Sequence, residues 1–325
     1  MPLNEFELID RYFKHLGADR SDVRLGVGDD AALLDCAANR QLVAAVDTLV
    51  DGVHFPRGSS AASVGHRALA VNLSDLAAMG AEPAWALLAL TLPRPDEPWL
   101  EEFSRAFGAL AREFRVALVG GDTTRGPLCV TVEILGSVER GTALRRSGGS
   151  PGDVLLVSGT PGDAAAGLEL VESRLEVQDA RIDRELRDRF LYPLPRVALG
   201  RRLRDYASAC IDVSDGMLAD ASRLARASGC GVVLDYDQLP LSSALESAVG
   251  PERAHELALT GGDDYELLFT VPPQRLDSLL HDLPPDEWTY HRVGTLRSAA
   301  GAVVERGGSV IEFSHYGFDH FAEPR

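Results

Sequence analysis

The sequence lacks the cysteine spacing of a zinc ribbon or of a disulfide framework. Its four cysteines, Cys36, Cys129, Cys210 and Cys230, are far apart, and no two of them form a C-x-x-C pair. Scattered cysteines of this kind are typical of thiols in a reducing compartment. We therefore expect neither a structural zinc ion nor disulfide bonds.

Long apolar and basic segments are also absent. The N-terminal stretch MPLNEFELID has neither the basic nor the apolar part of a secretory signal. The longest apolar run, residues 84–92, lies between two prolines and is too short to cross a bilayer. We expect a cytoplasmic protein with no membrane partner.

Positive charge is scarce. The 325 residues include 32 Lys and Arg against 49 Asp and Glu, which gives a net charge of −17. Such a surface repels nucleic acid and anionic membranes, so neither is an expected partner. It should also repel nucleotides, unless cations bridge the two. The positions of the acidic residues are therefore informative.

Several catalytic motifs are missing as well. There is no G-x-S-x-G of a serine hydrolase and no H-E-x-x-H of a zinc protease. The segment GVGDD lacks the third glycine of a dinucleotide fingerprint, and VGGDTTRG, residues 119–126, lacks the Lys-Ser or Lys-Thr of a P-loop. These absences exclude the commonest motif-based interpretations and leave the glycine-aspartate segments to explain.

Apolar periodicity predicts two mixed α/β domains. In the first half, Asn4 and Glu7 form the pattern of a capping box at a helix start, and further helices are expected over 61–79 and from Pro98. The helix from Pro98 is expected to bury one apolar stripe, formed by Trp99, Phe103, Phe107, Leu110 and Phe114. Strands are expected at 23–27, 41–47, 84–92, 116–119 and 128–138. The Gly-, Ser- and Arg-rich stretch between Glu139 and Gly152 predicts the boundary between domains 1–140 and 149–325. In the second half we expect strands at 153–159, 209–213, 232–236 and 265–271, and helices after Pro161 and over 217–228 and 273–283.

The aspartates that stand out lie at predicted strand ends or in glycine turns. They are Asp29, Asp30, Asp47, Asp51, Asp75, Asp122, Asp212, Asp215, Asp263 and Asp264. Taken singly, each is explained as a capping or turn residue. Taken together, they predict carboxylates that converge, and clustered carboxylates need a cation to offset their repulsion. Carboxylates without His or Cys favour Mg²⁺, Mn²⁺ or Ca²⁺.

The stretch VGGDTTRG is interpreted as a loop that meets phosphate through a metal ion. Mg²⁺ held by a few carboxylates completes its shell with water and substrate phosphates. Gly120 and Gly121 would offer backbone N–H groups to phosphate oxygens, while Asp122 would hold the metal. Three arginines are candidates for direct phosphate contact, with a solvated loop as the alternative: Arg125, Arg145 and Arg146.

Eight segments in order resemble one known family. They are GVGDDAAL, VDTLVDGVHF, NLSDLAAMGA, GGDTTRG, ALRRSGGSPGD, IDVSDG, GGDDYEL and GFDHF. The chain resembles the thiamine-monophosphate kinases of the aminoimidazole-ribonucleotide synthetase and selenophosphate synthetase superfamily. The resemblance implies an α+β fold of two mixed α/β domains, with the N-terminal sheet pairing across a homodimer. It also implies transfer of the γ-phosphoryl group of ATP to thiamine monophosphate, which yields thiamine diphosphate.

The resemblance also implies roles for individual residues. Mg²⁺ ligands would be Asp30, Asp47, Asp75, Asp122 and Asp212, with Asp215 holding a further ion. ATP would meet Gly121, Asp122, Arg146 and Ser214, and thiamine monophosphate would meet His54, Asp263 and Phe318. Two positions depart from the family pattern. Val46 replaces a hydroxyl residue, so a metal contact there would use its backbone carbonyl, and Asp263 replaces a longer glutamate.

No residue is expected to act as nucleophile or general base. A phosphate monoester has a second pKa near 6, so the acceptor oxygen is largely ionised at neutral pH. We expect direct in-line transfer with several Mg²⁺ ions offsetting the charge of both phosphates. Two alternatives are another ATP-dependent enzyme of the same superfamily and a non-catalytic Mg²⁺-nucleotide binding protein.

Overall fold

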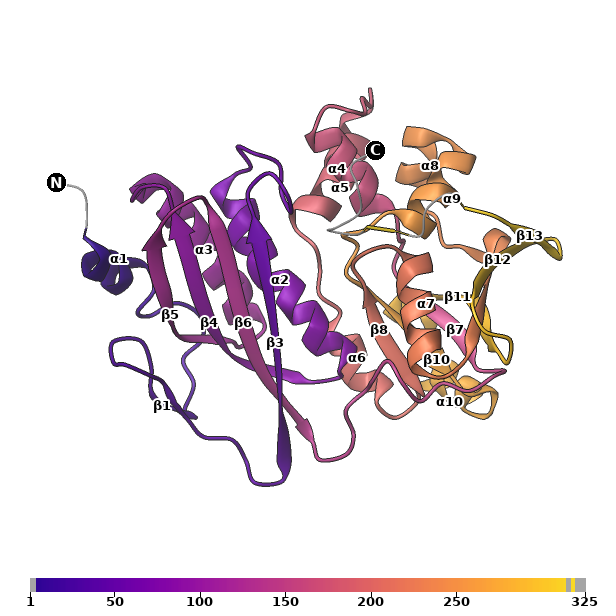
Figure 1. Ribbon diagram of the computed structural model, residues 1–325, viewed down its shortest axis with the longest axis horizontal. Helices are drawn as coiled ribbons and strands as arrows, with labels where there is room; N and C mark the ends of the chain where they lie inside the picture. Colours follow the sequence, from indigo (N-terminus) through magenta and orange to yellow (C-terminus); the bar gives the residue numbers. More distant parts are fainter. Residues whose placement is uncertain (1–3, 314–316, 319–325) are drawn as a thin grey trace. The chain divides into compact units, whose positions relative to one another are not determined.

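The computed structural model describes residues 4–313 and 317–318, without the side chains of residues 5 and 6. The chain forms two compact units (Figure 1). The N-terminal unit comprises Met1–Leu76 and Ala81–Ala143, and the C-terminal unit comprises Ala77–Gly80 and Leu144–Arg325. Both contain sheets and helices, as the periodicity predicts.

The N-terminal unit is built on a four-stranded sheet in the order β3-β6-β4-β5. Its strands are β3 (Arg40–Val50), β4 (Glu82–Leu92), β5 (Ala117–Arg125) and β6 (Cys129–Glu139). The β4–β5 pair is parallel, and β6 is antiparallel to both of its neighbours. Along β6, buried and half-exposed residues alternate, so one face of this sheet is covered and the other is open.

Helices α2 (Ala61–Ala78) and α3 (Glu97–Glu113) lie on the covered face of that sheet (Figure 1). Phe103, Phe107 and Leu110 of α3 are buried, which confirms the predicted apolar stripe. The first helix, α1 (Glu5–Tyr12), begins with the predicted capping box of Asn4 and Glu7. A two-stranded ribbon, β1 (Val23–Leu25) with β2 (Leu33–Leu34), completes the unit.

The prediction of a loop at VGGDTTRG is wrong, because strand β5 runs through this segment. The register between β4 and β5 shifts after Leu118, so that β5 carries one extra residue, Val119. Gly121 has a φ of 148°, and a Cβ atom there would lie 1.9 Å from the carbonyl oxygen of Leu88. Glycine is therefore required at position 121 by the close approach of two strands.

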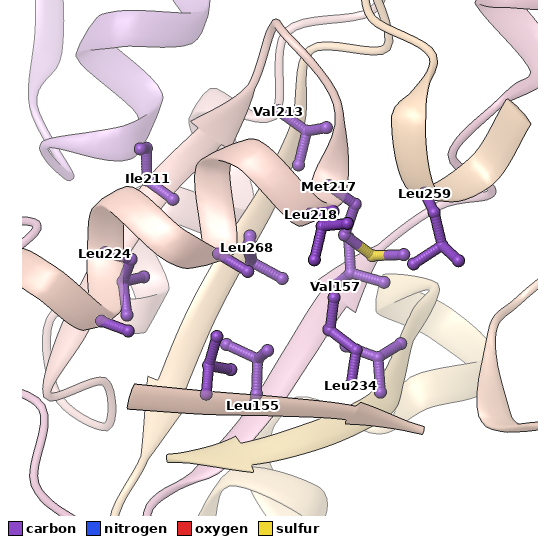
Figure 2. Close-up of a cluster of buried hydrophobic side chains, with 14 of the residues drawn as sticks. Leu155, Val157, Ile211, Val213, Met217, Leu218, Leu224, Leu234, Leu259 and Leu268 are labelled. Atoms are coloured by element: carbon purple, nitrogen blue, oxygen red, sulfur yellow. The ribbon is translucent and has the colours of Figure 1, made fainter. Parts of the chain in front are cut away.

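The C-terminal unit is built on a seven-stranded sheet in the order β13-β12-β9-β11-β7-β10-β8. The strands are β7 (Val154–Ser158), β8 (Ala209–Val213), β9 (Gly231–Asp235), β10 (Glu266–Val271), β11 (Tyr290–Arg297), β12 (Ala302–Arg306) and β13 (Ser309–Ile311). Helix α7 (Met217–Ala227) covers one face. Figure 2 shows Met217, Leu218 and Leu224 of α7 against leucines and valines of the sheet. This cluster fixes the position of α7 relative to β8.

The remaining helices of this unit are α4 (Asp163–Val171), α5 (Ala180–Leu191), α6 (Val197–Leu203), α8 (Ser243–Val249), α9 (Pro251–Thr260), α10 (Pro273–Asp282) and α11 (Pro285–Trp288), with a 3₁₀ turn at Tyr236–Gln238. Four of them, α4, α5, α8 and α9, pack on one another. Leu170, Leu186, Leu245 and Leu257 form a second core between α4, α5, α8 and α9. Within the described part of the chain, no helix has the length and apolar character needed to cross a membrane.

Candidate functional site

Asp47 and Asp75 lie within regular elements, and the expectation that they sit at strand ends or glycine turns is wrong. Asp47 is inside β3, where its backbone N–H donates to Asn72 Oδ1 at 3.1 Å. Asn72 is fully buried on α2. Asp75 follows it by three residues and so shares its helix face. The two aspartates therefore lie where β3 contacts α2.

Asp122 lies on the other outer strand, β5, and is exposed. Asp47 pairs with Val132, which pairs with Leu88, and Leu88 pairs with Gly121. Asp122 is one residue beyond this row, so it points to the opposite face from Asp47. Three strand spacings separate the two backbones, which is about 14 Å. Within one chain, these two carboxylates do not reach a common metal ion.

Asp30 and His54 lie in turns of the same unit. Asp30 is exposed between β1 and β2, and its N–H donates to Asp29 Oδ1 at 2.8 Å. His54 Nδ1 accepts a hydrogen bond from the Val50 N–H at 3.0 Å. This bond ties the histidine to the end of β3 and leaves Nε2 as the protonated nitrogen of the neutral ring. His54 thus has a structural role beside the expected binding role.

In the C-terminal unit, the expected residues gather where β8 ends. The Asp263 N–H donates to the Ser214 carbonyl at 2.8 Å, and the Phe318 N–H donates to the Asp215 carbonyl at 2.9 Å. The Tyr265 N–H donates to the carbonyl of Val213, again at 2.8 Å. Backbone hydrogen bonds therefore hold Ser214 and Asp215, the candidate ATP and metal residues, beside two of the three residues expected to contact the acceptor. Phe318 is 50% exposed, and the last three residues of the GFDHF motif lie outside the described residues.

Two residues of α7 organise this end of β8, and they are not among the predicted site residues. Asp220 is 1% exposed, and its Oδ2 accepts from the N–H groups of Ser214 and Asp215, each at 3.1 Å. Arg223 Nη1 lies 2.6 Å from Asp220 Oδ1 and 2.5 Å from Asp215 Oδ2. Burial raises the pKa of the Asp220 carboxyl to about 6. The D-x-x-R spacing at the start of a helix was the available sequence signal.

Asp264 has a different environment from its neighbour Asp263. Its carboxylate accepts from the N–H groups of Gly162 and Ala164, at 2.8 Å and 3.2 Å, where α4 begins. Burial raises the pKa of the Asp264 carboxyl well above its ordinary value, although these backbone hydrogen bonds oppose that shift. Asp264 therefore anchors the loop that carries Asp263 to α4.

The predicted phosphate-binding arginines lie elsewhere. The Arg145 carbonyl accepts from the Cys210 N–H at 2.8 Å, and the Arg146 carbonyl accepts from Ser228 Oγ at 3.1 Å. Cys210 is near the start of β8, whereas Ser214 follows its end, about 13 Å further along the strand. The structure therefore does not bring the backbone of Arg146 to Ser214. Arg125, at the end of β5, is exposed.

Comparisons with known proteins cover the whole chain. Residues 28–138 match the family described as AIR synthase related protein, N-terminal domain, and residues 150–305 match AIR synthase related protein, C-terminal domain. The thiamine-monophosphate kinase of Escherichia coli (strain K12) is 47% identical over 325 residues, which is 100% of both chains. The chain belongs to the thiamine-monophosphate kinase family. It is therefore a phosphotransferase, and the expected fold class of two mixed α/β domains is confirmed.

Solved structures of this family agree with that assignment. The crystal structure of thiamine-monophosphate kinase from Stenotrophomonas maltophilia K279a has a TM-score of 0.85 at 46% identity, covering 96% of this chain and 99% of that one. The structure "AaThiL complexed with AMPPCP and TMP" has a TM-score of 0.77 at 31% identity and covers 99% of each chain.

The donor set of this kinase fits a hard cation. Over the described ranges, no group of three or more His, Cys, Asp or Glu side chains lies close enough to hold a metal ion. Mg²⁺, however, commonly takes one or two protein carboxylates and completes its shell with water and phosphate oxygens. Asp212 is 5% exposed, and its charge helps to raise the pKa of Asp220 beside Asp215. Asp212 and Asp215 therefore fit an ion that arrives with a phosphate.

Proposed function

We propose that the protein transfers the γ-phosphoryl group of ATP to thiamine monophosphate, which gives thiamine diphosphate and ADP. The observation that carries this proposal is that four of the expected site residues lie together at the end of β8. Ser214 and Asp215, expected to meet ATP and metal, are joined by backbone hydrogen bonds to Asp263 and Phe318, expected to meet the acceptor. The likeness to a relative complexed with AMPPCP and TMP supports the same pair of substrates.

Charge is the main obstacle to this reaction, because both substrates are anions and the protein is acidic. Lys14 is the only lysine in the sequence, and it forms an ion pair with Asp10. Arginines and divalent cations must therefore neutralise the phosphates. Phosphoryl transfer depends chiefly on positioning and charge stabilisation, so a site without a general base is adequate for an acceptor that is already ionised.

We assign the metal-holding role to carboxylates of both units. In the C-terminal unit these are Asp212 and Asp215, and in the N-terminal unit Asp30, Asp47, Asp75 and Asp122, with the Val46 carbonyl as a further oxygen. Bound Mg²⁺ would lower the repulsion between the two phosphates. We also propose that Gly121 and Arg146 contact ATP and that His54 contacts thiamine monophosphate. Asp220 orients Ser214 and Asp215 through their N–H groups.

The open face and edges of the N-terminal sheet support a homodimer. Leu42 and Val46 of β3 are 53% and 60% exposed on the face that the helices leave uncovered. Among the described residues, β3 and β5 are also the edge strands of this sheet, and beyond the bridge of Gly17 to Ala117 no further strand pairs with them. We propose that a second copy covers this face. Strand pairing between copies would bring an outer-strand carboxylate of one chain close to that of the other.

The reaction is tested by ³¹P NMR of the purified protein with Mg²⁺, ATP and thiamine monophosphate. We expect ADP and thiamine diphosphate in equal amounts, and no ADP when formylglycinamidine ribonucleotide replaces the acceptor. ADP formation with that second acceptor would favour the synthetase alternative, and nucleotide binding without ADP would favour a sensor.

The in-line step has its own test. ATP made chiral at the γ-phosphorus should give thiamine diphosphate with inverted configuration, because a single displacement inverts the phosphorus. Retention would indicate two displacements through a phosphorylated enzyme and would contradict direct transfer.

A further inference from the structure

Arg223 holds two carboxylates at the start of α7, and one of them is a proposed metal ligand. Its Nη1 lies 2.5 Å from Asp215 Oδ2 and 2.6 Å from Asp220 Oδ1. The side chains of Arg223 and Asp215 are 35% and 29% exposed, whereas Asp220 is 1% exposed. The guanidinium thus lies between a buried carboxylate and a carboxylate that solvent reaches.

The two contacts serve different purposes. Asp220 uses one oxygen for the N–H groups of Ser214 and Asp215 and the other for Arg223, so it fixes the backbone of the turn. The bond from Arg223 to Asp215 adds nothing to that backbone and holds only the side chain. A partly exposed ion pair of this kind contributes little to stability. The ion pair between Arg223 and Asp215 therefore acts mainly on the affinity of the Asp215 carboxylate for other cations.

We propose that Arg223 is a positioning residue that sets the affinity of Asp215 for a divalent cation. The proposal rests on the metal-holding role of Asp215 stated above. The guanidinium fixes the rotamer of the carboxylate, and its charge opposes a cation that approaches the same oxygens. A charge of +1 about 6 Å from a charge of +2, even at the dielectric constant of water, changes the binding constant by about tenfold. The site would then bind its cation well only when substrate phosphates add their negative charge.

The probe is Mn²⁺, whose binding to the full chain without nucleotide is followed by the loss of its free electron paramagnetic resonance signal. We expect Arg223→Gln to lower the dissociation constant about tenfold, because glutamine keeps a donor for Asp220 but loses the charge. Arg223→Lys keeps the charge and should bind Mn²⁺ as the wild type does. Arg226→Gln, an exposed arginine one turn further along α7, is the matched control and should not change the affinity.

An unchanged or weaker affinity in folded Arg223→Gln would overturn the proposal, and so would a gain of the same size in Arg223→Lys. If the glutamine variant does not fold, Arg223→His at pH 8 takes its place, because a neutral imidazole also keeps a donor for Asp220, and the same gain is expected. The variant Asp215→Asn tests the metal-holding role of Asp215 separately from the role of Arg223. Should that variant retain all wild-type Mn²⁺ binding, Asp215 is not a ligand, and both its metal-holding role and the role of Arg223 fail. Should it lose binding while the Arg223 variants are unchanged, only the role of Arg223 fails.

Discussion

Asp47 and Asp122 lie on the two outer strands of one sheet and point to its opposite faces. Their separation and their opposite orientations follow from the same strand pairing. In that pairing Asp47 lies in line with Gly121 across the sheet, and Asp122 is the next residue along β5. The ions proposed for these two carboxylates would therefore be separate within one chain, and a metal ion on Asp122 would not be shared with Asp47 of the same chain.

Replacing Asp122 with Asn should affect turnover and leave stability almost unchanged. The carboxylate is exposed, so we expect the free energy of unfolding in metal-free buffer to change by less than about 0.5 kcal/mol. Loss of a charge-stabilising ligand should lower kcat at least about 100-fold. Glu139→Gln, at an exposed position of the same sheet, is the control. A large loss of stability with normal turnover would favour a purely structural aspartate.

Replacing Gly121 with Ala should instead destabilise the fold. The added Cβ would meet the Leu88 carbonyl at 1.9 Å in a backbone conformation that favours glycine. We expect urea unfolding to show a loss of about 3 kcal/mol or more. In Gly120→Ala the nearest atom is the flexible end of Leu87 at 2.9 Å, so the effect should be smaller. A stable Gly121→Ala protein with no activity would show that phosphate contact, not strand packing, requires the glycine.

Asp163 should make stability depend on pH. Burial raises the pKa of this carboxyl above its ordinary value of 3.8, against the hydrogen bonds from Ser242 and Thr160. A carboxyl with a raised pKa contributes stability at low pH and loses that contribution as the pH rises through the folded-state pKa. Asp163→Asn should therefore gain stability relative to the wild type between pH 4 and pH 7 in urea unfolding. Asp188→Asn, at an exposed site, should show no such trend, and a parallel pH profile for the Asp163 variant would contradict the prediction.

A charge on the open face of β3 should separate the proposed dimer. Leu42→Asp would place a carboxylate on that face, and burying it against a second copy would cost several kcal/mol. We expect sedimentation velocity to show a dimer for the wild type and a monomer for the variant. Val310→Asp, at a position of β13 that is 58% exposed, should remain dimeric. A wild-type monomer at micromolar concentration would contradict the dimer itself.

Local pattern was sufficient for most of the elements. The capping box of Asn4 and Glu7, the stripe of Phe103 and Phe107, and the strand at 209–213 are where the sequence predicts them, because each depends on residues a few positions apart. The helices at 180–191 and 243–260 and the strands after residue 289 were not predicted. Their apolar positions are sparse, and their cores come from distant segments.

The sequence by itself determined the charge balance and the motifs on which the proposed site residues rest: an acidic chain with one lysine and with aspartates in glycine-rich segments. Only the tertiary structure decided how those residues are grouped. Strand order set Asp47 apart from Asp122, and a backbone hydrogen bond between residues 49 positions apart joined Ser214 to Asp263. Hydrogen bonds from Gly162 and Ala164, also distant in the sequence, hold the Asp264 carboxylate at the start of α4, so that Asp264 and its neighbour Asp263 have different surroundings. Strand partners and loop contacts depend on how the whole core packs, which the local pattern around an aspartate does not encode.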